Sequence, residues 1–411
     1  MINKLSVPVG DFHLGSAEKN AILEVLENGK ISEGVMTSRF EDSFKKYIGT
    51  KYCIATSSGT SALQLIFLIM KNHSKFRQKI EKRKYIITNP VNYIATANAI
   101  TLSGYEPFFV DINKKDFSLK IEEVEDAVTS LGKENVAALL PVHVLGYPND
   151  MNRLRKIADE NDILLIEDSA EAHGTIFNGK RTGSLSSAGI FSFYIAHNIQ
   201  AGEMGCIVTD EKEIYKLARS LKANGRICDC NICTRSKGVC PHYEDNSSLG
   251  DFDPRFYHHL IGLNFKTMEF QSALALTQME KVDYIFSARQ DNVKYLNEKL
   301  VKFNDVMFLP LYSKDVSYLA YPLVLKDNFP FERHEFRKKL EDCGIENRPI
   351  FGCIPTQQPA YSFLREKYKG KLKNAEYVGS KGLYLGCHQY LNLEQLDHIV
   401  NVLEYLLDGV I

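Results

Sequence analysis

One histidine and one aspartate could move protons or hold a charged ligand. His197 lies in the segment Phe191-Ser-Phe-Tyr-Ile-Ala-His197. An imidazole can act as a general acid and base because its ordinary pKa lies near working pH. Asp168 ends the apolar run that begins at Ile163, and ligands bind at the carboxyl ends of strands in open parallel sheets. The alternative is that Glu167-Asp168 only caps the following helix.

Small polar residues precede a helical run near residue 60. The string Ser57-Ser-Gly59-Thr60-Ser61 comes directly before Ala62-Leu-Gln-Leu-Ile. Small residues at a helix amino terminus let backbone amides and hydroxyl groups close on a phosphate, which the helix dipole also attracts. Many helices begin with Ser or Thr beside Gly, so the string alone only indicates Gly59, Thr60 and Ser61 as candidate phosphate ligands.

Four of the nine cysteines fall within thirteen residues, at Cys228, Cys230, Cys233 and Cys240. In a chain without an evident export signal, such crowding favours a metal or cluster over disulfides. Four thiolates suffice for one tetrahedral zinc or for an iron–sulfur cluster. Both alternatives remain open on spacing alone.

Short apolar runs alternate with helical segments up to residue 209. Strands are expected at 85–88, 107–111, 136–141, 163–168, 189–193 and 205–209, with crossover helices at 121–130 and 152–160. Continuous apolar strands separated by helices indicate a mostly parallel sheet that is covered on both faces. The candidate residues therefore sit where this sheet would bind a ligand.

The remaining chain predicts an insertion and a second, smaller domain. Residues 225–255 are polar, cysteine-rich and poorly periodic, which is typical of an inserted loop. A helical stretch at about 267–299 leads to strands at 318–325 and 382–385 and to helices at 332–342 and 393–407. We expect residues 1–285 to form the large cofactor-binding domain and residues 286–411 the small carboxy-terminal domain.

Composition excludes several classes of protein. The 411 residues are 44% hydrophobic and 25% charged, which is ordinary for a soluble globular protein. The net charge of −1 gives no electrostatic reason to expect nucleic acid or an anionic membrane as a partner. No apolar run is long enough to cross a bilayer, and the first residues lack the apolar core of a signal peptide. A cytoplasmic protein is expected.

Together these motifs resemble the DegT/DnrJ/EryC1/StrS sugar aminotransferase family of pyridoxal-phosphate enzymes. The resemblance rests on the order and spacing of Ser-Gly-Thr-Ser-Ala-Leu, Ile166-Glu-Asp168-Ser-Ala-Glu-Ala-His-Gly174 and Phe191-Ser-Phe. It covers essentially the whole chain. It implies α/β aminotransferase fold type I, with a mostly parallel central sheet flanked by helices and a smaller carboxy-terminal α+β domain. It also implies a homodimer and a nucleotide-sugar substrate.

The resemblance gives three side chains a role at the cofactor. Asp168 would hydrogen-bond the pyridine nitrogen and keep it protonated, so that the ring can act as an electron sink. Ser192 would contact the phosphate. Tyr93 matches the aromatic residue that stacks on the ring face, although an ordinary core tyrosine is the alternative.

Three further positions follow from the same resemblance. Asn264, in Gly262-Leu-Asn264, matches a residue that reaches the phosphate of the neighbouring subunit, and Asn198 is a second candidate for such a contact. Glu171 stands where the family usually has Gln, so hydrogen bonding to the cofactor's phenolic oxygen is expected to differ. Met204 interrupts the family's usual Gly-Glu-Gly-Gly run.

His197 occupies the position where the family normally has the lysine that holds the cofactor. Imidazole cannot form that imine, and the nearest lysines, Lys180 and Lys212, are far along the chain. In one explanation the cofactor works as pyridoxamine phosphate and His197 serves as acid and base, which is the chemistry of the His-containing 3-dehydratase branch. Retained aminotransferase activity through another amine, or loss of catalysis, are the alternatives.

The cysteines also resemble one dehydratase branch. The CDP-4-keto-6-deoxyglucose 3-dehydrases carry an iron–sulfur cluster, with a Cys-x-Cys pair after Gly-Arg, here Gly225-Arg226. That branch has a further cluster cysteine where this chain has Ala170, so a structural zinc at the four cysteines is the alternative. With such a cluster, a reductase supplying electrons is a possible partner.

The sequence therefore predicts deoxygenation at C3 of a nucleotide-linked 4-keto-6-deoxyhexose, in deoxysugar and polysaccharide biosynthesis. Arg348, in Ile345-Glu-Asn-Arg348-Pro, is the candidate contact for the anionic part of the nucleotide. An exposed structural arginine is the alternative there.

Overall fold

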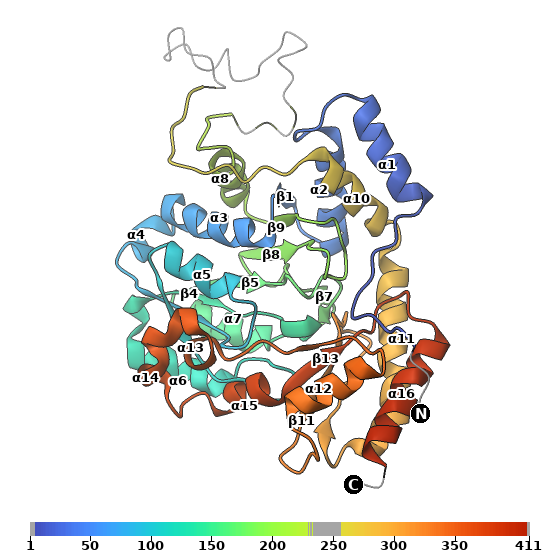
Figure 1. The fold of residues 1–411 in the computed structure, drawn as a ribbon. Coiled ribbons are helices and arrows are strands. Elements are labelled where there is room, and N and C mark those ends of the chain that lie inside the picture. The colour runs from blue at the N-terminus through green and yellow to red at the C-terminus, as the bar shows by residue number, and fades with distance from the viewer. Residues whose placement is uncertain (1–4, 229, 231, 233–255, 409–411) are drawn as a thin grey trace.

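A seven-stranded sheet contains most of the apolar runs of the sequence. Its strands are β1 (Tyr52–Thr56), β2 (Tyr85–Thr88), β3 (Glu106–Phe109), β4 (Val136–Leu140), β5 (Leu164–Asp168), β8 (Ala188–Ser192) and β9 (Gly205–Thr209). In the computed structural model, which describes residues 5–228, 230, 232 and 256–408, they follow the order β1-β9-β8-β5-β4-β2-β3 (Figure 1). β9 runs antiparallel to β1 and β8, and the other pairs are parallel.

Helices cover both faces of this sheet because successive strand residues alternate between two apolar sides. Ile54 packs with the helices of one face, whereas Cys53 and Ala55 pack on the other. The first face is covered by α3 (Gly59–Asn72), α5 (Ala95–Leu102) and α8 (Lys212–Leu221). The second is covered by α6 (Ile121–Leu131), α7 (Met151–Glu160), α2 (Val35–Ile48), α10 (Glu269–Met279) and α11 (Val282–Leu300).

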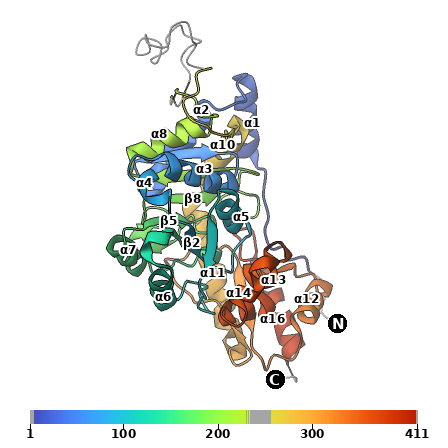
Figure 2. The same cartoon turned by 90° about the vertical axis from the view of Figure 1, so that its left-hand side faces the viewer.

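A second, antiparallel sheet lies in the carboxy-terminal part of the chain. Its order is β10 (Met307–Phe308), β11 (Tyr321–Leu325), β13 (Gly382–Leu385) and β12 (Asn347–Pro349). The helices of this part are α12 (Arg333–Asp342), α13 (Ile354–Gln357), α14 (Arg365–Tyr368), α15 (Lys373–Lys381) and α16 (Leu393–Leu407). These orange to red elements gather at one end of the molecule, near both chain termini (Figure 2). The predicted fold class is confirmed.

Short elements complete the chain. They are α1 (Ser16–Glu27), α4 (Arg77–Ile80), the hairpin strands β6 (Ile176–Phe177) and β7 (Lys180–Arg181), and the 3₁₀ turns Lys133–Asn135, Val144–Gly146, Val301–Phe303 and Pro359–Leu364. Among the described residues, no helix is both long and apolar enough to cross a membrane.

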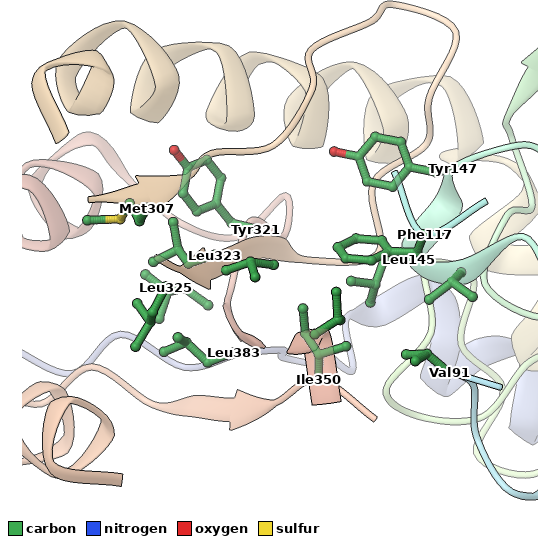
Figure 3. Packing of buried hydrophobic residues seen from close by; sticks show 14 of the residues in the cluster. Val91, Phe117, Leu145, Tyr147, Met307, Tyr321, Leu323, Leu325, Ile350 and Leu383 are labelled. Atoms are coloured by element: carbon green, nitrogen blue, oxygen red, sulfur yellow. The ribbon is translucent and has the colours of Figure 1, made fainter. Parts of the chain in front are cut away.

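The two sheets share one apolar core. Phe117, Leu145 and Tyr147, from loops of the larger sheet, pack in the same cluster as Leu323 of β11 and Leu383 of β13 (Figure 3). This packing brings the carboxy-terminal part against the ends of the parallel strands. The expected domain boundary between residues 285 and 286 falls inside α11 and stays a prediction.

Asp111 adds a polar link between the two parts. Its carboxylate, 1% exposed, accepts hydrogen bonds from the amides of Asn374 (3.0 Å) and Ala375 (2.9 Å) in the first turn of α15. Lys120 Nζ lies 3.0 Å from the same carboxylate. Asp111, two residues after the end of β3, thus caps α15 in the carboxy-terminal part of the chain.

We predict that Asp111→Ala lowers the free energy of unfolding by about 1–3 kcal/mol, because buried donors lose their acceptor. Chemical denaturation followed by far-ultraviolet circular dichroism measures the change. Asp126→Ala, on the exposed side of α6, is the matched control and is expected to have little effect. Equal unfolding free energies for the two variants would show that the cap contributes nothing.

Candidate active site

A cavity of about 870 Å³ lies at the carboxyl ends of β5 and β8. Its wall also includes the amino terminus of α3, the loop after β8, one side chain of α11 and the segment Val9–Phe12. The cavity brings together eight of the residues predicted from sequence: Gly59, Thr60, Tyr93, Asp168, Glu171, Ser192, His197 and Arg348. This edge is where an open parallel sheet places its ligand.

The amino terminus of α3 forms one end of the cavity. Ser58 is its N-cap, and the Ser58 hydroxyl accepts a hydrogen bond from the Ser61 amide at 3.0 Å. A Cβ on Gly59 would lie 2.6 Å from Cβ of Ser192, so only glycine allows β8 to pass this close. The Ser61 hydroxyl is within 2.9 Å of the Ser58 hydroxyl and does not line the cavity, whereas Ser58 does. Ser58, with Thr60, is therefore the better placed of the cap serines for a phosphate.

Asp168, the last residue of β5, also lines the cavity. Its carboxylate accepts hydrogen bonds from Thr96 Oγ1 (2.8 Å) and from the Ala170 amide (3.2 Å). Burial raises the pKa of Asp168 above its ordinary value, and these two bonds act against that rise. No Lys or Arg of the described chain lies within ion-pair distance of Asp168. A cationic ligand group would supply the missing partner.

Glu171 is a buried acid on the same wall. Its Oε2 accepts a hydrogen bond from the Leu145 amide at 2.6 Å. Burial, and to a smaller extent the nearby charge of Asp168, raises the pKa of Glu171 to about 7. At neutral pH a large share of Glu171 is therefore protonated and can donate a hydrogen bond, as the amide of a Gln would.

His197 and His173 bind the same carbonyl. Nδ1 of His197 lies 3.0 Å from the Ser192 oxygen, and Nε2 of His173 lies 2.8 Å from it. Because a carbonyl only accepts, both ring nitrogens carry protons, and Nε2 of a neutral His197 is then unprotonated. Burial lowers the pKa of His197 to about 4, so the ring is neutral at physiological pH. The sequence motif contained His173 but did not indicate this shared bond.

No lysine is among the described residues that line the cavity. The buried Lys222 lies elsewhere, where its Nζ donates to the Ala55 carbonyl at 2.8 Å and pairs with Glu33. The amine that would tether an aldehyde cofactor therefore has no counterpart in the described cavity wall.

Of three further predicted residues, Tyr93 lines the cavity, whereas Asn198 and Asn264 do not. Tyr93 is 64% exposed on the cavity wall, with its ring centroid 6.1 Å from that of Phe351. Asn198 is fully buried and its amide donates to the Ser317 carbonyl of the same chain, which does not support a cross-subunit contact. Asn264 is exposed outside the cavity, where Ala223 and Asn264 form a β-bridge.

The predicted metal site cannot be assembled from the described residues. Cys228 and Cys230 are both half-buried. Cys233 and Cys240, with most of the predicted insertion, lie outside the described residues. Within the described part of the chain, no group of three or more His, Cys, Asp and Glu side chains could hold a metal ion. The four-cysteine ligand set stays a prediction.

Sequence reasoning missed several residues of the wall. Thr96 and Gln200 lie within or next to the motifs that contain Tyr93 and His197. The available signal for Thr96 was that it is a polar side chain about one helical turn after Tyr93. Arg289, on α11, also lines the cavity. Its neighbours are distant in sequence, and no local pattern marks it.

This donor set fits pyridoxal 5′-phosphate or its amine form. A helix amino terminus with hydroxyl groups suits the phosphate, and the buried carboxylate of Asp168 suits a protonated ring nitrogen. Tyr93 presents an exposed aromatic ring on the same cavity wall. Ser58, Thr60 and Ser192 would hold the phosphate, and Asp168 the ring nitrogen.

We predict that Glu171→Gln stabilises the cofactor-free protein more at high pH than at low pH. Because the folded pKa exceeds the usual 4.5, the unfolded state loses its proton first, and wild-type stability falls as pH rises from 4.5 to about 7. The loss is on the order of 2–3 kcal/mol and is absent from Glu171→Gln. Thermal unfolding at about pH 5 and pH 8 measures it. A constant difference between the two proteins across this range would contradict the prediction.

Comparison with known proteins places the site in context. The model of the DegT/DnrJ/EryC1/StrS aminotransferase family matches residues 13–404. GDP-4-keto-6-deoxy-D-mannose 3-dehydratase of Yersinia pseudotuberculosis is 29% identical over 97% of this chain and 98% of its own.

Two solved structures are similar throughout. A GDP-4-keto-6-deoxymannose-3-dehydratase with a trapped PLP-glutamate geminal diamine has a TM-score of 0.83 and 28% identity, covering 97% of this chain and 100% of the other. PseC of Helicobacter pylori, an aminotransferase of pseudoaminic acid biosynthesis, has a TM-score of 0.83 and 26% identity, covering 97% and 99%.

These comparisons test the predicted family and cofactor, but not the exact reaction. The family and its pyridoxal-phosphate-bound member support the predicted vitamin B6 cofactor, whereas neither supports an iron–sulfur cluster. Both dehydratases and aminotransferases are among the similar proteins, so likeness alone does not choose between the two reactions. The family match spans both sheets and all of the described cavity wall except Val9–Phe12. The chain belongs to the DegT/DnrJ/EryC1/StrS aminotransferase family.

Proposed function

We propose that this protein removes the C3 hydroxyl of a nucleotide-linked 4-keto-6-deoxyhexose, using pyridoxamine phosphate. The observation that carries the proposal is the presence of His197, and of no lysine, among the described residues of the cavity wall. An imidazole can move a proton but cannot tether an aldehyde. The similar GDP-4-keto-6-deoxymannose-3-dehydratases make a GDP-sugar our first choice of substrate.

His197 is the proposed acid and base. Its Nδ1–H donates to the Ser192 carbonyl, which orients the ring and leaves Nε2 of the neutral form unprotonated. The Ala170 backbone also raises the pKa of His197 and so favours the protonated ring, against the larger effect of burial. The low pKa of His197 follows from burial and keeps the base available above about pH 4. His173, bound to the same carbonyl, supports that position and is a positioning residue.

Pyridoxamine phosphate would supply an amine for the sugar ketone and an electron sink for the expulsion of the neighbouring hydroxyl. Asp168 would hold the ring nitrogen as a cation, with Thr96 Oγ1 orienting the carboxylate at 2.8 Å. The protonated fraction of Glu171 would donate a hydrogen bond on the same wall. These residues position and polarise; His197 moves the proton.

Replacing a C3–O bond by C3–H requires two electrons. We propose L-glutamate as their source, as the similar dehydratase with trapped PLP-glutamate suggests. The balance is glutamate plus the 3-hydroxy sugar giving 2-oxoglutarate, ammonia and the 3-deoxy sugar. With this donor, no iron–sulfur cluster or reductase is required.

The sugar nucleotide would enter at the more open side of the cavity. Arg348, whose side chain is 46% exposed, lines this wall and pairs with Glu346 at 3.2 Å. A diphosphate could replace that carboxylate on Arg348. Asn264 is exposed at the surface and is the proposed contact to the second subunit of a homodimer.

A nucleotide-sugar aminotransferase is the second candidate. The likeness to the Helicobacter pylori aminotransferase over nearly the whole chain favours it. An aminotransferase would keep nitrogen on the sugar and would need an amine to hold the aldehyde cofactor. The composition of the described cavity wall therefore favours the dehydratase.

We predict that GDP-4-keto-6-deoxymannose, pyridoxal phosphate and L-glutamate give a sugar nucleotide that has lost one oxygen atom and gained no nitrogen. Mass spectrometry of the product measures this directly. His197→Asn is expected to lower kcat by about 10²- to 10⁴-fold because the proton acceptor is lost.

His334→Asn, on the exposed surface of α12, is the matched control and is expected to keep full activity. An amino sugar as product, or an undiminished rate in His197→Asn, would refute the proposed reaction.

A further inference from the structure

Arg289 is a buried cation in the cavity wall that the proposed reaction does not yet use. It lies on α11, is 3% exposed, and lines the same cavity as His197. Its Nη1 donates to the carbonyl oxygens of Tyr318 (3.3 Å) and Leu319 (2.9 Å). Its Nε is buried without a hydrogen-bond partner.

No carboxylate compensates this charge. Among the described residues, no Asp or Glu oxygen lies within 4.0 Å of the Arg289 guanidinium, unlike the buried Arg219, which pairs with Glu41. Moving an unpaired ion out of water costs several kcal/mol, and carbonyl dipoles offset only part of that cost. A buried arginine that faces a ligand cavity in this state is prepared to receive an anion.

The groups around Arg289 do not balance it either. Burial lowers the pKa of His197 and of His388 to about 4, and the positive charge of Arg289 acts in the same direction on both. His173 is affected in the same way. These neutral imidazoles do not offset the positive charge of Arg289.

We propose that Arg289 binds the carboxylate of the amino-acid donor, so that the donor's α-carbon lies beside His197. This inference rests on the proposed use of an amino-acid donor. It adds that the cavity holds a dedicated carboxylate subsite, made by Arg289 at the α11 side.

A phosphate is the other anion that an arginine could receive here. The two other candidate anion sites of the cavity suit phosphates better: the α3 amino terminus for the cofactor and the exposed Arg348 for a bulky nucleoside diphosphate. Arg289 is nearly inaccessible from the surface, and a single carboxylate on a small donor fits such a position. Arg289 therefore binds the amino-acid donor, and Arg348 binds the sugar nucleotide.

Calorimetric titration of the pyridoxamine-phosphate-loaded protein with glutarate tests the subsite. Glutarate has the donor's carboxylates but no amine, so binding is measured without turnover. Arg289→Gln is expected to weaken glutarate binding by about 10- to 100-fold, the range of a charge-assisted hydrogen bond, and to leave GDP binding unchanged. Arg348→Gln is expected to show the opposite pattern.

Two further variants guard against a merely structural effect. Arg289→Lys keeps the buried charge and serves if Arg289→Gln does not fold; it is also expected to weaken glutarate binding, because it loses the guanidinium's planar fork. Arg333→Lys is the matched control, since Arg333 also donates through Nη1 to two carbonyls, those of Gly379 and Gly382, but lies outside the cavity wall. It is expected to bind glutarate normally.

Unchanged glutarate affinity in both Arg289 variants, loss of GDP binding instead, or an equal loss in Arg333→Lys would overturn the subsite. The outcome is independent of the sugar chemistry. Release of 2-oxoglutarate from L-glutamate is common to dehydratases and aminotransferases, so a weakened glutarate site together with an amino-sugar product would keep the subsite and reject the dehydratase.

Discussion

The site depends on one carbonyl that accepts two imidazole protons. The Ser192 oxygen, at the end of β8, takes Nδ1–H of His197 and Nε2–H of His173. A carbonyl oxygen has two lone pairs, so both bonds can form at once, and each fixes the tautomer of its ring. The bond to His197 leaves its other nitrogen unprotonated. Burial keeps both rings neutral, because it lowers the pKa of each.

The rest of the fold places ligand groups around that pair. β5 delivers Asp168 to the cavity wall, and the amino terminus of α3 forms another part of that wall. The second sheet closes the cavity through the shared apolar core and contributes Arg348. Burial raises the pKa of Asp168 and Glu171 and lowers that of His197, so one cavity holds acids and a base whose proton affinities are all shifted from their ordinary values.

Much of this arrangement could be predicted from sequence because buried parallel strands read as continuous apolar runs. The run ending at Asp168 and the run leading to Ser192 became β5 and β8, and the motifs at their ends converge in the cavity. β1 was not predicted, because Tyr52–Thr56 is a short run whose end merges with the phosphate string. α2 was also missed, since its apolar face is carried mainly by Phe40, Phe44 and Ile48 in a polar segment.

Side-chain direction was the part that local patterns could not supply. Asn198 follows His197 directly, yet it points into the chain's own core toward Ser317. Arg289 follows His197 by 92 positions in the sequence, so only tertiary packing reveals that both line the cavity. Ser58 caps α3 and accepts a hydrogen bond from the Ser61 amide, and Ser58 lines the cavity whereas Ser61 does not. Each outcome depends on which distant segment packs against the residue.

The most direct test of the account is whether the cofactor is bound without a covalent bond to the chain. The protein, loaded with pyridoxal phosphate, is treated with borohydride, denatured and weighed intact by mass spectrometry. Because His197 cannot form an imine, we expect the mass of the bare polypeptide, with all of the reduced cofactor recovered in the filtrate. A reduced pyridoxyl adduct on any lysine would contradict it, because an amine would then do what the described cavity wall has no residue to do.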